Sequence, residues 1–410
     1  MTAFNSGPSI KLYRKISNWF NFDKNNVLQV YSGKIDIGQH ISSTLALISS
    51  KITGINYDQV EIIKLNTDIS PNEGKTASSL SVPDSGSAIK AASFTLRKSF
   101  LKYSLQTLKV DVDKIIFDNG IIKDINSNRS VSYWDFANTK EFKELIIPEE
   151  FDENEIKEFN YKNNQKIEIK TIHDIVSGKY SYVHDMKFPK MLHARIIRPP
   201  NYYSKFVEII NEIEDKLIEL DIKLIVKGSF LAILSPDEFL VVKYLEIIKQ
   251  NIVWEELRDL SYNNIYKSLK ENNRDTLLVK SGGQAFYEAI PIIKDFKDKS
   301  CTTLTSEYKK GYLMHGPIGP SAACSIFSNN KFTIYSHSQA LYDLKLSCSE
   351  YFGVDPENVT LKFIPGSGCY GHNGADDVAF EAGLLSKEFP DTHVLLKWTR
   401  QDEHCWEPYG

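Results

Sequence analysis

The amino-acid sequence predicts an α+β fold that is divided into more than one domain. Its 410 residues exceed what one ordinary hydrophobic core organises. Short alternating apolar runs, typical of half-buried strands, alternate along the chain with longer stretches of helical periodicity. Charged, asparagine-rich segments at 139–170 and 268–275 separate three such blocks. The hydrophobic content of 42% and the charged content of 25% are those of an ordinary globular protein.

The first block reads as a layered arrangement of strands and helices. VLQVYSG (27–33) alternates like a strand, and Ile41, Leu45, Ile48 and Ile52 form one apolar stripe of a helix that Gly54 can close. A second strand is expected at 60–65, a polar loop at 66–87 and a helix at 88–105. This order is typical of α/β and α+β folds.

The second and third blocks continue the same pattern. We predict strand, turn and strand over 180–200, an amphipathic helix at 206–220, two strands within 224–235 and a helix at 238–257. These elements make one compact α+β unit. The third block, from about 276, contains the apolar run VTLKFI (359–364), a glycine-rich loop, a helix and a strand at 393–398.

Charge and cysteine usage exclude several classes of function. The formal charge of −4 comes from 49 basic and 53 acidic residues, so we expect no nucleic-acid or anionic-membrane partner. No apolar run approaches the roughly 20 residues that a membrane span needs, and the first residues lack the apolar region of a signal peptide. The five cysteines form no C-x-x-C pair, so neither zinc nor an iron–sulfur cluster is predicted. We expect free thiols and a cytoplasmic location.

GSGCYG (366–371) satisfies the dinucleotide-binding pattern G-x-G-x-x-G between a strand and a helix. Two features argue against a Rossmann loop: HNG is inserted before the helix, and the acidic Asp402 lies 36 residues after Gly366, later than expected. A turn without any ligand is the other simple interpretation. An oxidoreductase using NAD or FAD through this loop therefore stays open as an alternative.

Further polar segments are open to two interpretations each. Gly38 and Gln39 fit a simple turn and helix start, and the hydroxyl-rich loop SPNEGKTASSLS (70–81) fits either a solvated loop or a phosphate site. Gln339 ends a predicted strand, where it can contact a ligand or cap a helix. Two sets of residues read as structural: the isolated histidines His184, His193 and His315, and the acids Asp402, Glu403 and Glu407, which we interpret as a solvated charge cluster.

Seven segments occur in one order and together carry a family resemblance: GKIDIGQHISSTLALI, SPNEGKTASSLSV, YVHDMKFPKMLHARIIRPP, HGPIGPSAA, SHSQ, GSGCYGHNGADDVAFEAGLL and KWTRQDEHCWEPYG. They resemble the large, molybdopterin-binding subunit of bacterial molybdenum hydroxylases in the xanthine dehydrogenase/aldehyde oxidase superfamily. The likeness is greatest to the isoquinoline 1-oxidoreductase and nicotinate dehydrogenase type. It runs from about residue 17 to the end of the sequence.

The resemblance implies a domain order and a set of cofactor contacts. The domain order is an N-terminal molybdopterin-binding segment at 1–140, a linker at 141–175, an α/β hammerhead domain at 176–262 and the first, truncated part of the main molybdopterin-binding domain at 276–410. The implied cofactor contacts, none of them a direct metal ligand, are Gly38, Gln39, Ser79, Ser81, Gln339, Gly368, Tyr370 and Gly371. Neutral donors and closely approachable glycines suit an anionic pterin.

The sequence also departs from the family pattern. His40 stands where a second glycine is usual, Lys190 replaces a turn glycine, and Asn373 and Gly374 replace a Lys-Glu pair, which indicates a different substrate pocket. The family's catalytic glutamate lies in a second half that this sequence does not contain. We therefore assign no catalytic residue, and we keep open both a subunit that acts with a separate chain supplying that half and an inactive fragment.

The implied reaction is the oxidative hydroxylation of an N-heterocycle or an aldehyde, with water as the oxygen source. The implied cofactor is molybdenum-molybdopterin in its cytosine dinucleotide form. Because this chain has no cluster cysteines, electrons would leave through a small [2Fe–2S] partner subunit.

Overall fold

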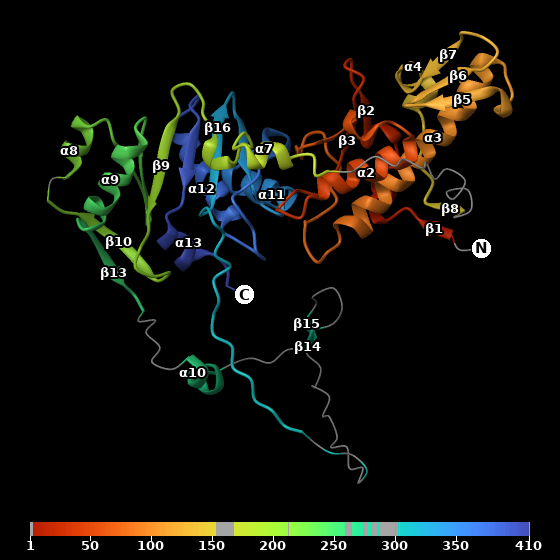
Figure 1. Ribbon diagram of the computed structural model, residues 1–410. Helices are drawn as coiled ribbons and strands as arrows, with labels where there is room; N and C mark the ends of the chain where they lie inside the picture. Colours follow the sequence, from red (N-terminus) through yellow and green to blue (C-terminus); the bar gives the residue numbers. More distant parts are fainter. Residues whose placement is uncertain are drawn as a thin grey trace.

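The computed structural model of the chain describes residues 3–152, 168–211, 213–258, 265–273 and 304–409, with 278–279, 285–286, 300 and 302. It contains an N-terminal unit of mixed strands and helices and a large mixed sheet with helices on its faces (Figure 1). The α+β class predicted from the sequence is confirmed. Within the described residues, no helix has the length and apolar character that crossing a membrane requires.

The N-terminal unit is built on a three-stranded sheet in the order β2-β3-β4 (Phe20–Phe22, Leu28–Tyr31 and Val60–Ile63). Strands β3 and β4 are parallel and are joined through helix α2 (Ile41–Thr53), which packs against the long helix α3 (Ser87–Leu108). Helix α2 ends where predicted, because Gly54 adopts φ +72° and donates its N–H to the carbonyl of Ser50.

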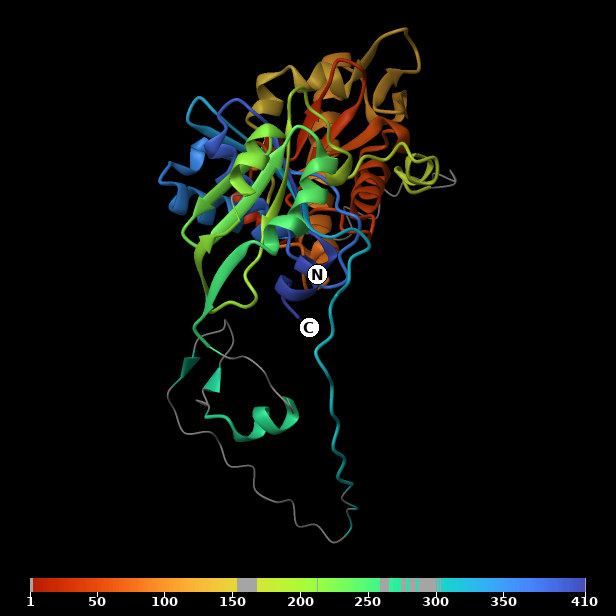
Figure 2. The same ribbon diagram turned by 90° about the vertical axis from the view of Figure 1, so that its left-hand side faces the viewer.

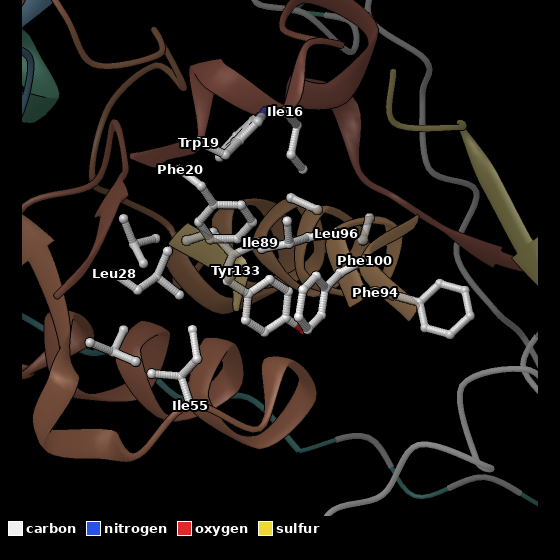
Figure 3. Packing of buried hydrophobic residues seen from close by; sticks show 14 of the residues in the cluster. Ile16, Trp19, Phe20, Leu28, Ile55, Ile89, Phe94, Leu96, Phe100 and Tyr133 are labelled. Carbon is white, nitrogen blue, oxygen red and sulfur yellow. The ribbon is translucent and has the colours of Figure 1, made fainter. Parts of the chain in front are cut away.

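Aromatic side chains fill the core of this unit (Figure 3). Trp19 and Tyr133 are fully buried, and the Tyr133 ring stacks on Phe100 with 4.0 Å between centroids. The small elements that surround this core are α1 (Pro8–Leu12), β5 (Ile115–Asp118), β6 (Ile121–Asp124), β7 (Ser130–Ser132), α4 (Tyr133–Ala137) and α5 (Lys140–Lys143), with β1 (Ala3–Asn5) paired to β8 (Glu150–Asp152).

Seven strands form the large sheet, in the order β11-β12-β9-β19-β16-β17-β18. Pairs β9–β19 and β17–β18 are parallel and the other pairs are antiparallel. The strand bounds are Lys223–Lys227, Phe230–Ser235, Leu192–Ile197, Val394–Lys397, Ala322–Ser328, Lys331–Ser336 and Val359–Phe363, in sheet order.

Both faces of this sheet are covered, which explains why its central strands are continuous apolar runs. In β12, Leu231 and Ile233 face the cluster of α8 (Ile213–Glu219) and α9 (Glu238–Lys249). Ala232 and Leu234 point the opposite way, into the cluster of α11 (Leu341–Phe352) and α12 (Ala375–Glu388).

The sheet topology argues against the Rossmann alternative. Strand β18, the following loop, α12 and β19 have the expected order, but β16 and β17 lie between β18 and β19. Dinucleotide-binding units place the two parallel strands next to each other around the phosphate loop. The start of α12 is moreover occupied by acids of the protein itself: Asp376 and Asp377 lie in its first turn, and the Gly374 N–H donates to Glu403 at 3.4 Å.

The N-terminal unit is joined to the free edge of β18. Phe363 donates its N–H to the carbonyl of Leu65 at 2.8 Å, and Thr67 donates its N–H to the carbonyl of Leu361 at 3.0 Å. The chain leaving β4 thus covers the outer edge of the sheet. This contact brings the hydroxyl-rich loop 70–81 beside the segments that follow β17 and β18.

Two predicted helices are partly strands. The segment 206–220 contains the end of β10 (Ser204–Ile209) before α8 begins, and 238–257 contains α9 followed by β13 (Ile252–Glu256). Strands β10 and β13 pair antiparallel with each other. Helical prediction was wrong at these ends because a pairing partner about 45 residues away decides the conformation.

The segment 180–191 was predicted as strand and turn, but it holds only the short helical turn η5 (Val183–Asp185) before β9. In the predicted linker 141–175, residues 153–167 lie outside the described part. The following residues include α7 (Ile172–Val176), which runs between the N-terminal unit and the sheet (Figure 1).

The proposed domain boundaries remain predictions. Strands from 176–262 and from 276–410 belong to one sheet, so these two ranges share a core in this chain. Between them lie α10 (Ile265–Glu271), β14 (Leu278–Val279) and β15 (Ala285–Phe286). An extended run then leads upward into β16 (Figure 2).

Candidate functional site

Two glycine loops that are far apart in the sequence line one cavity of about 480 Å³. One loop precedes α2 and contributes Gly38 and His40. The other follows β18 and contributes Gly366, Gly368 and Tyr370 with their neighbours. The remaining wall comes from Asp36, Ile37, Thr171, Ile175, Tyr180, Tyr182 and Ile318. The structure therefore brings Gly38, Gly368 and Tyr370, three of the predicted contacts, to a common site.

The loop before α2 is folded largely on itself. The Asp36 carboxylate caps the helix by accepting the N–H groups of Ile41 at 3.0 Å and Ser42 at 3.3 Å. The Gln39 side chain accepts from the Ile37 N–H at 2.7 Å and donates to the Ile35 carbonyl at 2.9 Å. Both ends of the Gln39 amide are thus used within its own loop.

The groups that this loop can offer a ligand are therefore backbone N–H groups. Gly38 adopts φ +112°, a conformation that favours glycine, and a Cβ there would meet nothing within 4 Å. Among the described residues, the N–H groups of Gly38, Gln39 and His40 have no hydrogen-bond partner. The predicted contact at Gln39 can be made by its N–H more readily than by its side chain.

The predicted serine contacts lie outside the lining of this cavity. Ser79 is exposed and, like Ser78, has a left-handed backbone, with φ +57° and +54° respectively. Ser81 begins the helical turn η3 (Ser81–Gly86), which continues into α3. The loop still presents hydroxyls and helix-start amides at one end of α3, but within the described part of the chain no hydrogen bond joins Ser79 or Ser81 to the glycine loops.

A buried carboxylate that no sequence motif singles out holds this serine loop. Glu73 is 8% exposed and accepts hydrogen bonds from the hydroxyls of Ser9 at 3.0 Å, Ser32 at 3.2 Å and Ser85 at 2.8 Å, and from the Gly33 N–H at 2.7 Å. Burial raises its pKa, and the hydrogen bonds from Gly33, Ser85 and Ser9, with the charge of Lys34, oppose the shift. The sequence feature that could have pointed to this contact is Gly33. A glycine is needed there because a Cβ would lie 2.3 Å from the Pro71 carbonyl oxygen.

Gln339 joins the serine loop to the glycine loop. Its Nε2 donates to the Thr76 carbonyl at 2.8 Å, and the Thr76 N–H donates to the Gln339 carbonyl at 2.9 Å. Its Oε1 lies 3.4 Å from both Cys369 Sγ and His372 Nδ1. Three predicted motifs, 70–81, SHSQ and GSGCYGHN, therefore meet at this one side chain.

The glycine loop itself needs its glycines. Gly368 adopts φ +122° and Gly371 adopts φ +140°. A Cβ on Gly371 would lie 2.6 Å from His315 Cδ2, and a Cβ on Gly368 would lie 2.8 Å from Tyr370 Oη. Tyr370 is 55% exposed and lines the cavity, whereas Gly371 packs behind it against His315.

The acids of the C-terminal helix α13 (Arg400–Trp406) are not the solvated cluster that we expected from the sequence. Asp402, Glu403 and Glu407 are all at most 3% exposed. Glu403 accepts from the Ser321 N–H at 2.6 Å and from the Gly374 N–H at 3.4 Å, and burial raises its pKa. Glu403 and Glu407 anchor segments that support the glycine loop, and Asp402 caps α13 by accepting the Thr399 N–H at 2.9 Å.

Glu407 fixes the segment before β16 in the same way, by accepting the backbone N–H of His315 at 2.5 Å.

Within the described part of the chain, no group of three or more acidic, cysteine or histidine side chains is arranged to hold a metal ion. His193 lies 3.5 Å from Glu238, whose pKa Arg195 and Lys397 lower to about 2 against the opposing effect of burial. The structural interpretation of His193 and His315 stays a prediction, because Nδ1 of each ring has no hydrogen-bond partner among the described residues.

The cavity presents hydrogen-bond donors that suit an anionic, polar group. It offers backbone N–H groups, three glycines (Gly38, Gly366 and Gly368) and the side chains of Tyr180, Tyr182 and Tyr370. Burial, with Asp36 and Tyr182, raises the pKa of Tyr180 to about 12, so this hydroxyl stays a donor at neutral pH. Among the described residues that line the cavity, Asp36 is the one acid, and its carboxylate is already bonded to α2.

Comparisons with known proteins show what the chain is similar to. Residues 2–173 match the family of molybdopterin cofactor-binding domains. A subunit of the nicotinate dehydrogenase of Pseudomonas putida is 24% identical over 415 aligned positions, covering 98% of this chain and 33% of that protein. The chain thus spans about a third of the length of this curated relative.

Solved structures with detectable similarity include quinoline 2-oxidoreductase from Pseudomonas putida 86, with 11% identity and a TM-score of 0.41 over 57% of this chain and 34% of that one. Aldehyde oxidoreductase from Desulfovibrio gigas has 15% identity and a TM-score of 0.41, over 58% of this chain and 30% of that one. The resemblance seen in the sequence is confirmed by the matches to the domain family and to the curated relative. The chain is therefore similar to a molybdopterin cofactor-binding domain over residues 2–173 and to a nicotinate dehydrogenase subunit over nearly its whole length.

Proposed function

We propose that this chain binds molybdenum-molybdopterin in the cavity between the loops at Gly38–His40 and Gly366–Tyr370, as the cofactor-binding part of a molybdenum hydroxylase. The observation that carries the proposal is that two motifs more than 300 residues apart, each implied in cofactor binding by the family resemblance, line the same cavity. The match of residues 2–173 to a molybdopterin-binding domain supports it independently.

In this proposal each loop has a definite task. The free N–H groups of Gly38, Gln39 and His40 bind anionic oxygens, because helix-start amides favour negative charge. Tyr370 supplies an aromatic wall, and Gly368 keeps the backbone close to the bound group. Gln339 holds the loop against Thr76 and orients its own amide toward Cys369.

The proposed reaction is oxidative hydroxylation of an N-heterocycle or an aldehyde with water as the oxygen source. The bound cofactor would supply the two-electron redox chemistry. The reaction needs a general base, and we assign none to this chain. We therefore propose that it works in a larger assembly with the remaining part of the catalytic subunit and a small [2Fe–2S] subunit. The cytosine dinucleotide form, the hammerhead role of 176–262 and a cytoplasmic location belong to the same proposal.

Metal analysis and pterin fluorescence of the purified chain, produced in a host that makes molybdopterin, test the proposal. We expect molybdenum and pterin in near-equal amounts, and finding NAD or flavin instead would overturn it. Gln339→Ala should lower cofactor content, while Gln106→Ala, an exposed change on α3, should leave it unchanged. In an assembled enzyme, Gln339→Ala should lower turnover more than folding stability.

A further inference from the structure

His337 lies directly behind the start of the glycine loop. It follows strand β17 in the SHSQ segment and is 4% exposed. A Cβ on Gly366 would lie 2.5 Å from His337 Nδ1 and 2.6 Å from its Cγ. The ring therefore occupies the space that any larger residue at position 366 would need.

Both ring nitrogens of His337 face hydrogen-bond donors. The Ala322 N–H donates to Nε2 at 3.3 Å, and Asn373 Nδ2 lies 3.3 Å from Nδ1. A charged imidazolium carries hydrogens on both nitrogens and can accept neither bond, whereas a neutral ring has one lone pair, which can accept the Ala322 N–H at Nε2. Burial, together with the nearby His184, lowers the pKa of His337 to about 3, in the same direction.

Asn373 passes the contact on to the far side of the loop. Its Nδ2 also lies 3.4 Å from the Gly368 carbonyl, and its Oδ1 accepts the Ala375 N–H at 3.1 Å, at the start of α12. One buried side chain therefore contacts the first residue of the loop directly and reaches its middle and its end through Asn373. Neighbouring residues of the same segment hold α12, since Ser338 donates to Asp376.

We propose that His337 is a positioning residue, a neutral imidazole that fixes the loop 366–374 in the conformation that lines the cavity. Its consequence for cofactor binding rests on the proposed function, but its effect on the loop does not. The ionisable groups nearest this network are His184 on η5, Asp376 on α12 and Glu403 on α13, which bonds to Ser321 and Gly374. Protonation of the ring would remove the acceptor contact at Nε2 with the Ala322 N–H and loosen the hold of His337 on the loop.

The test compares the wild-type chain with His337→Gln and with the control His404→Gln, an exposed change on α13. Histidine ¹⁵N NMR at pH 5 reports the protonation of the ring, and the amide resonances of Gly366 and Gly368 report the loop. We expect His337 to remain neutral at pH 5, where exposed histidines are charged. The loop resonances should move in His337→Gln and stay in place in the control.

Cofactor content gives the second readout. In protein produced with molybdopterin, His337→Gln should retain about tenfold less cofactor than wild type, equivalent to the loss of about one hydrogen bond. A doubly protonated His337 at pH 5, or unmoved loop resonances in His337→Gln, would overturn the inference. If His337→Gln fails to fold, the wild-type ring spectrum alone decides. Wild type without any cofactor would contradict the proposed function and leave the NMR result to decide the inference.

Discussion

The two loops that line the cavity use a glutamine in opposite ways. Gln39 satisfies both ends of its amide inside the loop before α2, with Ile37 and Ile35. Gln339 satisfies its amide between segments, with Thr76 on one side and Cys369 and His372 on the other. One loop is self-contained, and the other depends on chain that is remote in sequence.

The difference shows which contacts determine the conformation of each loop. The loop at 36–40 is fixed by residues within six positions of one another, including the Asp36 cap of α2. The loop at 366–374 is held by His337, by Gln339 and, through Glu403, by α13. Changes far from the cavity should therefore disturb the second loop and spare the first.

We expect the largest effect at Glu73, which binds residues of the N-terminal unit that are remote from it in the sequence. Glu73→Ala leaves three hydroxyls and the Gly33 N–H without their buried acceptor, at a cost of about 3–5 kcal/mol in the free energy of unfolding. Glu73→Gln keeps the shape and should cost less. Urea unfolding measures both, and a loss below about 1 kcal/mol for Glu73→Ala would show that the hydrogen bonds of the carboxylate are unimportant.

The next largest effects are expected at the glycines, where the same substitution should cost more stability in the glycine loop than in the loop before α2. Gly371→Ala adds strain at φ +140° and an overlap with His315, and should cost about 2–4 kcal/mol. Gly38→Ala adds only the strain at φ +112°, because nothing lies within 4 Å, and should cost about 1–2 kcal/mol. Thermal or urea unfolding of the pair checks the order, which must reverse for the account of the glycine loop to be wrong.

Acid should weaken the fold through His337. Its pKa is lowered to about 3 in the folded chain, so the unfolded chain binds more protons between that value and about 6.5. Stability is therefore lost as the pH falls, by about 2 kcal/mol at pH 5 for this one group. His337→Gln lacks this contribution, so its loss between pH 7.5 and pH 5 should be smaller than that of wild type. Parallel curves for the two proteins would contradict the assignment.

The smallest effects should come from the two glutamines themselves. Gln39→Ala and Gln339→Ala each remove net hydrogen bonds worth about 1 kcal/mol. Hydrogen exchange separates them. We expect faster exchange near 36–40 only in Gln39→Ala, and faster exchange in both 74–80 and 366–374 in Gln339→Ala. Effects confined to residues around 339 would mean that it bridges nothing.

The sequence predicted features that local contacts determine and missed features that depend on residues distant in the sequence. Helix α2 with its Gly54 end and the strand–loop–helix unit β18–α12 were predicted, because neighbouring residues determine them. Strands β10 and β13 were missed, because each depends on a partner distant in the sequence. Burial of Glu403 and Glu407 was missed for the same reason: the N–H groups that they accept belong to residues 29–92 positions away.

The site was predictable only as a set of separate motifs. Gly38, Gly368 and Tyr370 were expected to act together, and they share one cavity. Ser79 and Ser81 do not line it, and Gln39 turns inward, since the local hydrogen bonds that decide this have no signature in composition or spacing. Glu73 and His337 hold the two halves of the site but were not predicted. Each lies in a segment from which other residues were chosen as candidate contacts.

The central claim is that the cavity between the two loops binds molybdopterin. Hydrogen exchange of cofactor-loaded against cofactor-free chain tests it most directly, with mass spectrometry resolving the peptides. We expect slower exchange on loading at 36–41 and at 366–372, and no change at 213–227, where α8 and β11 line a separate groove of about 580 Å³. Protection that leaves both glycine loops unchanged, or that falls at 213–227 instead, would contradict it.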